Sequence, residues 1–361
     1  MRPIFINGRF LSQRITGTQR YAHELLNQLD LKLEKVSIET PEAAPSVTLL
    51  VPPAVQPLPK YRNIRVSSVG LSSGQPWEQI ELPFHARGGI LFSMVGGAPL
   101  LHPRNILTLH DAAVFAMPGS FSAAFRLWYQ FLYRRLCHAA LHLFTVSRFS
   151  RDEIVNWTGA AAEKITVTYL GSEHALRPTP DAGVLARNNL QPRKYILAVG
   201  SRNPSKNLRG LLQAFATLEA ADLDLAVAGP SYAKVFGEHE IESEHIRDLG
   251  YVSDSELRSL YENAACFVFP SFYEGFGLPP LEALALGCPT VVAEGSALSE
   301  IFKNVALLCD PGNPGDIAQK ILQAAQSSDT DREACREFAR AFRWERCAEV
   351  TLSKLLEYAN S

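Results

Sequence analysis

Short apolar runs of strand length alternate with segments of helical spacing along the whole chain, and this alternation limits the possible folds more than any other feature. In the first half the runs cover residues 3–7, 46–51, 90–93, 106–110, 143–147 and 165–169. In the second half they cover 195–200, 223–229, 246–252, 266–270, 290–293 and 306–309. Strands separated by helices form parallel sheets that are covered on both faces. We therefore predict an α/β fold.

A segment without clear periodicity, residues 171–193, separates the two series of strands. It contains three prolines and several polar residues, as an interdomain linker does. We place the boundary near Pro178, which gives two doubly wound, Rossmann-like domains over 1–177 and 178–343. A chain of 361 residues has the length for two domains of about 100–200 residues each. We expect ligands to bind in a cleft where the strand ends of both domains face each other.

The charge balance excludes some classes of partner. The chain has 35 Lys plus Arg and 37 Asp plus Glu, which is too balanced for a nucleic-acid binder that works by bulk charge. The first 180 residues hold 18 basic and 12 acidic residues, and the others hold 17 and 25. This asymmetry either indicates that the domains face different partners, one of them anionic, or reflects surface charge that has no functional role.

The sequence shows no sign of a membrane span or a secretory leader. No apolar run approaches the ~20 residues that a spanning helix needs, and the first seven residues have the pattern of a strand. We expect a cytoplasmic protein that begins at Met1. Six cysteines lack CxxC pairs or other metal-ligand spacing, so we expect buried thiols and no metal site. They are Cys137, Cys266, Cys288, Cys309, Cys335 and Cys347.

The segment 270–289 is the clearest candidate site. It has the pattern of a strand, a loop with Gly275 and Gly277, and a short helix that begins near Pro279. Glycines let backbone N–H groups approach a ligand, and a helix N-terminus favours an anion. Glu274 in the loop and Glu282, expected in the first helical turn, would accept hydrogen bonds from ribose or sugar hydroxyls. Alternatively, Glu282 serves only the helix dipole and Glu274 is a solvated loop residue.

This segment resembles the glutamate-seven-glutamate motif of family 4 glycosyltransferases. Four further motifs follow the family's order: a glycine loop, a first-domain histidine, a phosphate-binding lysine and a base-contacting turn. They lie at residues 16–21, 109–111, 199–207 and 250–253. The last helix, 344–361, resembles the family's closing helix, which packs back on the first domain. The resemblance covers nearly the whole chain and implies the two-domain GT-B fold, with the acceptor on the first domain and the nucleotide-sugar donor on the second.

The resemblance also implies roles for individual residues. His110, Lys206 and Glu274 would be catalytic: His110 and Glu274 would contact the transferred sugar, and Lys206 would neutralise the departing diphosphate. Glu282 would bind the ribose hydroxyls. The remaining donor-binding candidates are Gly17, Ser201, Arg202, Tyr251, Val252, Gly275, Phe276, Gly277 and Leu278.

Several of these residues have alternative interpretations. Many relatives have an arginine where this chain has Ser201, so Arg202, one position later, is the weaker phosphate candidate. Lys206 could instead be a surface residue at a helix start, and His110 a structural histidine at a strand end. Arg20 is either an acceptor-side cation or a solvated helix residue.

The expected activity is retaining transfer of a hexose or deoxyhexose to a glycan or lipid-linked acceptor, in polysaccharide, O-antigen or exopolysaccharide assembly. Family habit slightly favours GDP-mannose as the donor over UDP-hexoses and dTDP-rhamnose, and no cofactor is implied. Two alternatives stay open: a nucleotide-sugar 2-epimerase of the same fold, and a non-catalytic nucleotide-sugar-binding homologue. The segment 121–151 mixes aromatic residues with arginines. It either contacts an anionic membrane surface, at the inner face of the membrane, or packs its aromatic residues in the core.

Overall fold

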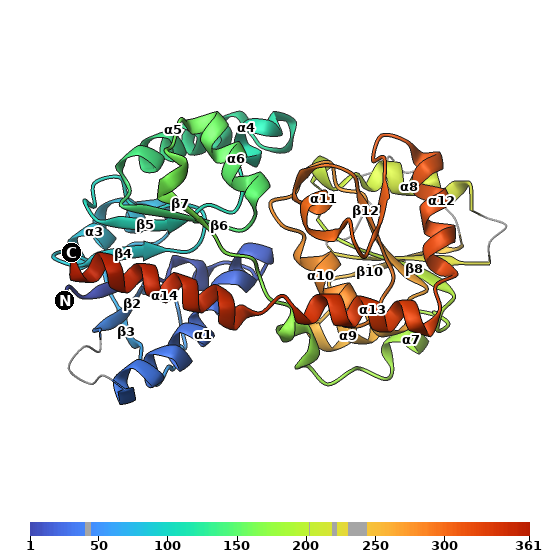
Figure 1. The fold of residues 1–361 in the computed structure, drawn as a ribbon, viewed down its shortest axis with the longest axis horizontal. Helices are drawn as coiled ribbons and strands as arrows, with labels where there is room; N and C mark the ends of the chain where they lie inside the picture. The colour runs from blue at the N-terminus through green and yellow to red at the C-terminus, as the bar shows by residue number, and fades with distance from the viewer. Residues whose placement is uncertain (40–44, 202, 219–221, 230–243) are drawn as a thin grey trace. The chain divides into compact units, whose positions relative to one another are not determined.

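The computed structural model describes residues 1–361 except 40–44, 202, 219–221 and 230–243 (Figure 1). It divides the chain into two compact units, Met1–Leu170 with Arg343–Ser361, and Gly171–Phe342. Each unit contains one parallel sheet with helices on both faces, as the alternation of strands and helices predicts.

The structure places the first change of unit at Leu170, before the predicted boundary near Pro178. The intervening residues make polar contacts with the second unit. The guanidinium of Arg258 donates to the carbonyl oxygens of Leu176 and Pro178 at 2.6 and 2.8 Å. Every residue has a backbone carbonyl oxygen, so the amino-acid composition does not reveal these contacts. The sequence therefore does not show to which unit the linker belongs.

The first sheet has seven described strands in the order β3-β2-β1-β4-β5-β6-β7. Their bounds are β1 Ile4–Asn7, β2 Val47–Val51, β3 Arg65–Ser68, β4 Ile90–Ser93, β5 Asn105–Thr108, β6 His142–Thr145 and β7 Ile165–Val167. The sequence analysis missed β3, which is a short edge strand with three polar residues. The order reverses between β1 and β4, and we call this position the first switch point. Loops diverge at the carboxyl ends of such a strand pair, where ligands of doubly wound sheets bind.

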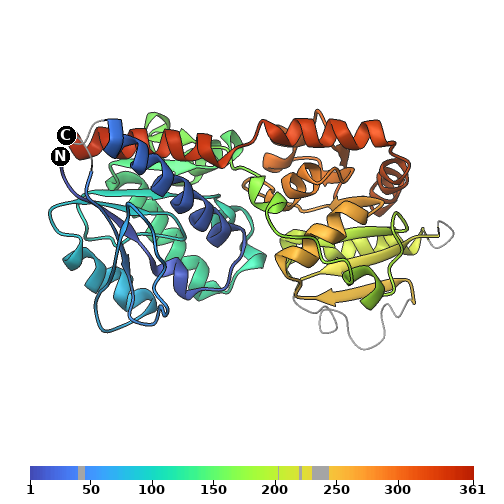
Figure 2. The same cartoon turned by 90° about the horizontal axis from the view of Figure 1, so that it is seen from below.

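Long helices cover both faces of this sheet. Helices α1 (Gly17–Glu39) and α14 (Trp344–Asn360) lie side by side on one face, and α5 (Ala123–Ala139) and α6 (Arg148–Thr158) lie on the other (Figures 1 and 2). The closing helix thus belongs to the first unit. Shorter elements complete the unit: η1 Arg9–Ser12, α2 Gly74–Pro76, the π-helix η3 Trp77–Glu81, α3 Leu82–His85, α4 Ala113–Ala116, η4 Pro118–Ser120 and η5 Ala162–Lys164.

The second sheet has six described strands in the order β10-β9-β8-β11-β12-β13. Their bounds are β8 Tyr195–Val199, β9 Asp224–Ala228, β10 Ile246–Gly250, β11 Cys266–Phe269, β12 Thr290–Ala293 and β13 Leu307–Cys309. All six lie within or overlap the predicted runs. The second switch point lies between β8 and β11.

Helices also cover the second sheet on both faces. Their bounds are η6 Glu173–Leu176, α7 Val184–Arg187, η7 Pro204–Lys206, α8 Leu208–Ala216, α9 Asp254–Asn263, α10 Leu278–Ala285, α11 Ser296–Phe302, α12 Pro314–Ala325 and α13 Asp329–Arg340. Apolar residues of α8 and α12 pack on one face of β8, β9 and β11. The predicted capping box of Ser253 and Glu256 is present at the start of α9. All six cysteines are buried free thiols. Within the described residues, no helix combines the length and the apolar character that a membrane crossing requires.

Replacing Trp344 with alanine should lower the free energy of unfolding of the first unit by about 3–5 kcal/mol, because it deletes a large side chain from the core. Trp344 is 1% exposed, and its ring lies 6.1 Å from that of Tyr21 on α1. All four tryptophans, at positions 77, 128, 157 and 344, belong to this unit, so tryptophan fluorescence during urea unfolding reports on it alone. Trp157→Ala is the matched control, because Trp157 is 43% exposed. Equal losses in the two variants would contradict the assigned core.

Candidate functional site

The loops that leave the second switch point carry a lysine and a glutamate in direct contact. Lys206 ends η7, which follows β8, and Glu274 lies in the loop after β11. The Lys206 Nζ donates to the Glu274 Oε1 at 2.5 Å and lies 5.3 Å from the centroid of the Phe269 ring. The two side chains are 27% and 13% exposed. The structure thus brings together two of the residues that the sequence analysis singled out, at the strand ends where it expected them.

Asn207 holds Lys206 in place. Its backbone is left-handed, with φ 54°, and its side-chain oxygen accepts from the N–H of Gly210 to cap α8. Its amide donates to the carbonyl oxygens of Pro270 and Pro311 at 3.1 and 2.7 Å. These bonds tie the loop after β8 to the loops after β11 and β13, so the lysine stands on a rigid turn.

The glycine loop leads directly into α10. Gly277 has φ 99°, and a Cβ there would lie 2.6 Å from a side-chain carbon of Leu298, so both conformation and packing require glycine. Helix α10 begins at Leu278, one residue before the predicted start. Pro279 and Pro280 have no N–H, so the backbone donors of this turn come from residues 275–278. All four are among the donor-binding candidates of the sequence analysis.

The earlier start of α10 places Glu282 in the second helical turn, not in the first as predicted. Its Oε1 lies 2.7 Å from the Nε2 of His174 on η6, and its Oε2 accepts from the Tyr261 hydroxyl at 3.5 Å. Its side chain is largely buried. Contacts with ribose hydroxyls remain a prediction for this residue. His174 was not singled out, because it lies 108 positions from Glu282 within the predicted linker.

The other donor-binding candidates of the second unit lie at neighbouring strand ends. Tyr251 and Val252 follow β10, and Tyr251 is 83% exposed. Because β9 separates β10 from β8, these residues lie about 10 Å to the side of β8, two strand spacings away. Ser201 is exposed, and its hydroxyl accepts from the N–H of Asn203 at 3.4 Å. Arg202 lies outside the described residues.

His110 lies at the end of β5 in the first unit, next to the loop that follows β4. Its Nε2 is 3.0 Å from the carbonyl oxygen of Met94, and its ring meets Tyr21 edge-on at 4.7 Å. A carbonyl oxygen only accepts, so Nε2 carries the proton and Nδ1 is left as an acceptor. Burial lowers the pKa of His110 to about 4, against the opposing effect of the bond to Met94. The neighbouring Asp111 accepts from the N–H of Ala113, which orients the turn into α4.

The structure places the donor-binding candidate Gly17 at the first residue of α1. A Cβ at this position would meet nothing within 4 Å, so the backbone there is accessible. Arg20 is partly buried in the first turn of the same helix.

Two charged residues that the sequence did not reveal meet at the first switch point. The Arg9 Nε lies 3.2 Å from the Glu78 Oε1, and Glu78 is fully buried. No sequence signal marks the pair, because its members are far apart in the chain and belong to no shared motif.

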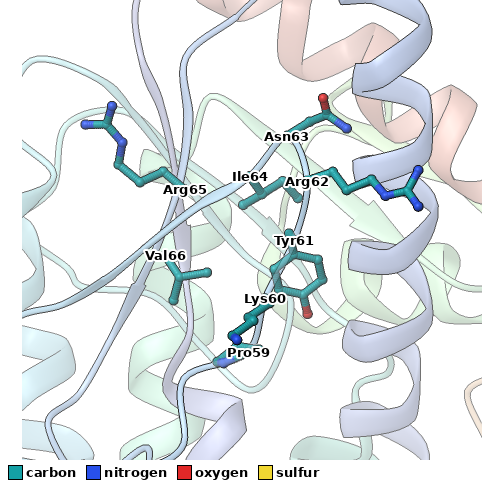
Figure 3. Close-up of a pocket in the computed structure, with 8 residues that line it drawn as sticks. All are labelled: Pro59, Lys60, Tyr61, Arg62, Asn63, Ile64, Arg65 and Val66. Atoms are coloured by element: carbon teal, nitrogen blue, oxygen red, sulfur yellow. The ribbon is translucent and has the colours of Figure 1, made fainter.

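The described residues also bear on two other kinds of site, a metal site and a ligand pocket. Within the ranges that the structure describes, no group of three or more His, Cys, Asp or Glu side chains could hold a metal ion. A shallow pocket is lined by residues 59–66, which precede and begin β3 (Figure 3). The Asp30 carboxylate holds this loop by accepting from the N–H groups of residues 62–64. The pocket lies at the amino end of β3, whereas the first switch point lies at the carboxyl ends of β1 and β4.

Comparisons with known proteins match both units. Residues 15–175 match the family model described as Glycosyltransferase Family 4, and residues 186–342 match that of Glycosyl transferases group 1. The chain is 36% identical over 267 residues to O-antigen chain mannosyltransferase B of Escherichia coli, covering 69% of each chain. It is 30% identical to O-antigen chain mannosyltransferase RfbU of Salmonella typhimurium, over 64% of this chain and 63% of that protein. The crystal structure of Anabaena HepE with UDP and glucose has the same fold, with a TM-score of 0.69 at 15% identity over 98% of this chain and 99% of that one.

The structure predicts that His110 is neutral at pH 6, with the proton on Nε2 and a titration midpoint near 4. Nitrogen-detected NMR of histidine-labelled protein would measure both properties, and His110→Gln would assign the signal. Because the folded pKa lies below the ordinary value of 6.5, the unfolded chain binds more protons between pH 6.5 and 4. The free energy of unfolding should therefore fall as the pH is lowered through this interval, and less so in His110→Gln. An imidazolium signal from His110 at pH 6 would contradict the assignment.

Proposed function

This chain belongs to glycosyltransferase family 4, and we propose that it transfers a mannosyl residue from GDP-mannose to a glycan or lipid-linked acceptor with retention of anomeric configuration. The Lys206–Glu274 pair at the second switch point carries this proposal, together with the adjoining glycine loop and α10. Two relatives, 36% identical over 267 residues and 30% identical over 235 residues, are O-antigen chain mannosyltransferases, which supports mannose as the sugar.

Lys206 supplies the fixed cation for the leaving group. Negative charge grows on the nucleoside diphosphate as the bond to the sugar breaks, so a cation held at that position favours the transition state over the ground state. The ammonium has three donors, and Glu274 accepts from one of them. The others can bind phosphate oxygens while the ion pair stays intact. The backbone N–H groups of residues 275–278 and the N-terminus of α10 add donors for the same diphosphate.

Glu274 and His110 supply hydrogen-bond acceptors for the transferred sugar. The Glu274 carboxylate is positioned by Lys206 and can accept from two sugar hydroxyls. The Nδ1 of neutral His110 can accept one further hydrogen bond from a sugar hydroxyl, because the Nε2–H already donates to the carbonyl oxygen of Met94. With its pKa lowered to about 4, His110 is too weak a base to take a full proton near neutral pH, so its role is to bind a hydroxyl.

Thermal stability in the presence of a nucleotide-sugar panel tests the donor. A ligand that binds the folded state at 100 times its Kd stabilises it by about 2.7 kcal/mol. We expect the largest rise in Tm with GDP-mannose, compared with UDP-glucose and dTDP-rhamnose. A larger rise with one of the others would replace the proposed donor. Product analysis separates the alternatives: an altered sugar nucleotide without an acceptor indicates a 2-epimerase, and binding without turnover indicates a non-catalytic homologue.

Within the same proposal, Lys206→Ala and Glu274→Ala should each reduce kcat for mannosyl transfer by about 10²–10³, as the loss of a transition-state contact does. Release of GDP measures the rate, and circular dichroism checks the fold. Lys194→Ala is the matched control, since Lys194 forms an exposed ion pair with Asp222 in the same unit. Full activity in either site variant would overturn the assigned roles.

We further propose that α5 contacts an anionic membrane surface on the cytoplasmic side. Leu132, Leu136 and Cys137 face the core, whereas other apolar residues of the helix point outward. The outward residues are Phe125, Leu127, Trp128 and Phe131, each 37–63% exposed. The aromatic residues of α5 are therefore not all core residues, which was the alternative expectation. The helix also carries three arginines at positions 126, 134 and 135 and no acidic residue, so its charge complements anionic lipid.

Vesicle flotation tests the membrane contact. The protein should float with vesicles that contain phosphatidylglycerol and much less with pure phosphatidylcholine, and high salt should weaken binding. The triple variant Leu127→Ser, Trp128→Ser, Phe131→Ser should lose at least tenfold in affinity. The double variant Leu31→Ser, Ile38→Ser is the control, because both residues are exposed on α1, across the sheet. Equal binding to both lipids, or a triple variant that binds as the wild type does, would exclude the contact.

A further inference from the structure

A buried ion pair joins the carboxyl ends of the two strands at the first switch point. Arg9 follows β1, and Glu78 lies in the π-helix η3. Besides its contact with Arg9, the Glu78 Oε1 accepts from the Asn7 amide at 2.8 Å, and that amide lies 3.1 Å from the Ser93 hydroxyl at the end of β4. Arg9 is 7% exposed and Glu78 is fully buried. The pair therefore lies where a doubly wound sheet binds its ligand.

Buried polar atoms of this cluster are unsatisfied. Among the residues that the structure describes, the buried Glu78 Oε2 and Gln75 Oε1 have no hydrogen-bond partner, and the contact of Arg9 with Glu78 uses only its Nε. A Cβ on Gly96 would lie 3.8 Å from the Arg9 Nη2 and 4.0 Å from the Tyr129 hydroxyl. Gly96 has φ 76°, which favours glycine. The glycine thus keeps side-chain atoms out of the space between the guanidinium and the hydroxyl.

A structural role alone explains this arrangement poorly. Desolvation makes a buried ion pair a weak source of stability unless its remaining donors and acceptors are satisfied. Burial raises the pKa of Glu78, and only the contacts with Arg9 and Asn7 oppose this effect. Buried polar groups without partners are uncommon in folded proteins and call for an explanation. A ligand that supplies the missing partners provides one.

We propose that Arg9 and Tyr129 form a subsite for a neutral sugar residue of the acceptor, with Glu78 as the positioning residue for Arg9. This inference rests on the proposed function, because it assigns the acceptor side of the same reaction. The guanidinium donates, the Gln75 amide oxygen accepts, and the tyrosine hydroxyl does either, which matches the mixed donors and acceptors of a sugar. A phosphate group fits less well, because the Glu78 carboxylate already balances the charge of Arg9.

The subsite adjoins the residue that we assign to the transferred sugar. His110 is bonded to the carbonyl oxygen of Met94, and Met94 directly follows Ser93 of the cluster. A sugar held by Arg9 and Tyr129 therefore has its hydroxyls close to His110, as an attacking acceptor requires.

Kinetics with GDP-mannose and neutral octyl glycosides of mannose, glucose, galactose and N-acetylglucosamine test the subsite. Arg9→Gln should raise the KM for the accepted glycoside at least tenfold while the KM for GDP-mannose changes less than twofold. Tyr129→Phe removes one hydroxyl with little risk to folding and should raise the acceptor KM severalfold. Glu78→Gln should act in the same direction as Arg9→Gln, and Arg9→Lys should restore part of the loss. Arg62→Gln is the matched control, because Arg62 is an exposed arginine of the same unit.

Three outcomes would overturn the subsite. The first is a lowered Tm with an unchanged acceptor KM in both Arg9→Gln and Tyr129→Phe, which indicates a purely structural pair. The second is donor turnover without use of any neutral glycoside. The third is inhibition by inorganic phosphate that competes with the acceptor and disappears in Arg9→Gln, which indicates an anion site. Saturation-transfer NMR of the glycosides without donor separates this inference from the proposed function: contacts that Arg9→Gln removes support the subsite even if GDP-mannose is not the donor.

Discussion

The hydrogen-bonded pairing of parallel strands governs the arrangement of both units. Parallel neighbours need a crossover that returns the chain to the same edge of the sheet, so every strand of a unit ends at one edge. Where the strand order reverses, successive crossovers pass to opposite faces and their loops separate. The Lys206–Glu274 pair stands at this position in the second sheet, and the Arg9–Glu78 pair stands there in the first. The strand order of each sheet therefore determines where these charged side chains lie.

The two ion pairs differ in what their surroundings allow. Lys206 is a flexible ammonium, partly exposed and beside an aromatic ring, so it can turn toward a phosphate without leaving Glu274. Arg9 is a planar guanidinium held at one nitrogen by a fully buried carboxylate, so its remaining donors point in fixed directions. A flexible ammonium suits a leaving group whose charge changes during the reaction. A guanidinium with fixed N–H directions suits the recognition of hydroxyls.

Sequence patterns predicted the fold class and most strands because their interiors are continuous apolar runs, as in β8 and β11. They missed β3, because an exposed edge strand carries little of that pattern. The resemblance to the family assigned Lys206, Glu274 and the glycine loop to one donor site, and the structure brings the lysine and the glutamate into contact. Local motifs did not predict the second-turn position of Glu282, which depends on a one-residue shift in the start of α10, or its contact with His174. The Arg9–Glu78 pair stayed hidden because only the folded sheet brings its members together.

The return of the chain to the first unit has a consequence for synthesis. Helix α14 buries Trp344 against α1, yet it follows the complete second unit in the chain. On the ribosome, residues 1–170 therefore emerge without the helix that covers the Tyr21 face of their sheet, and residues 171–342 can fold first. The apolar face of the earlier unit stays exposed until translation reaches the last helix. A chain that stops before α14 leaves this face uncovered, where chaperones and proteases can bind it.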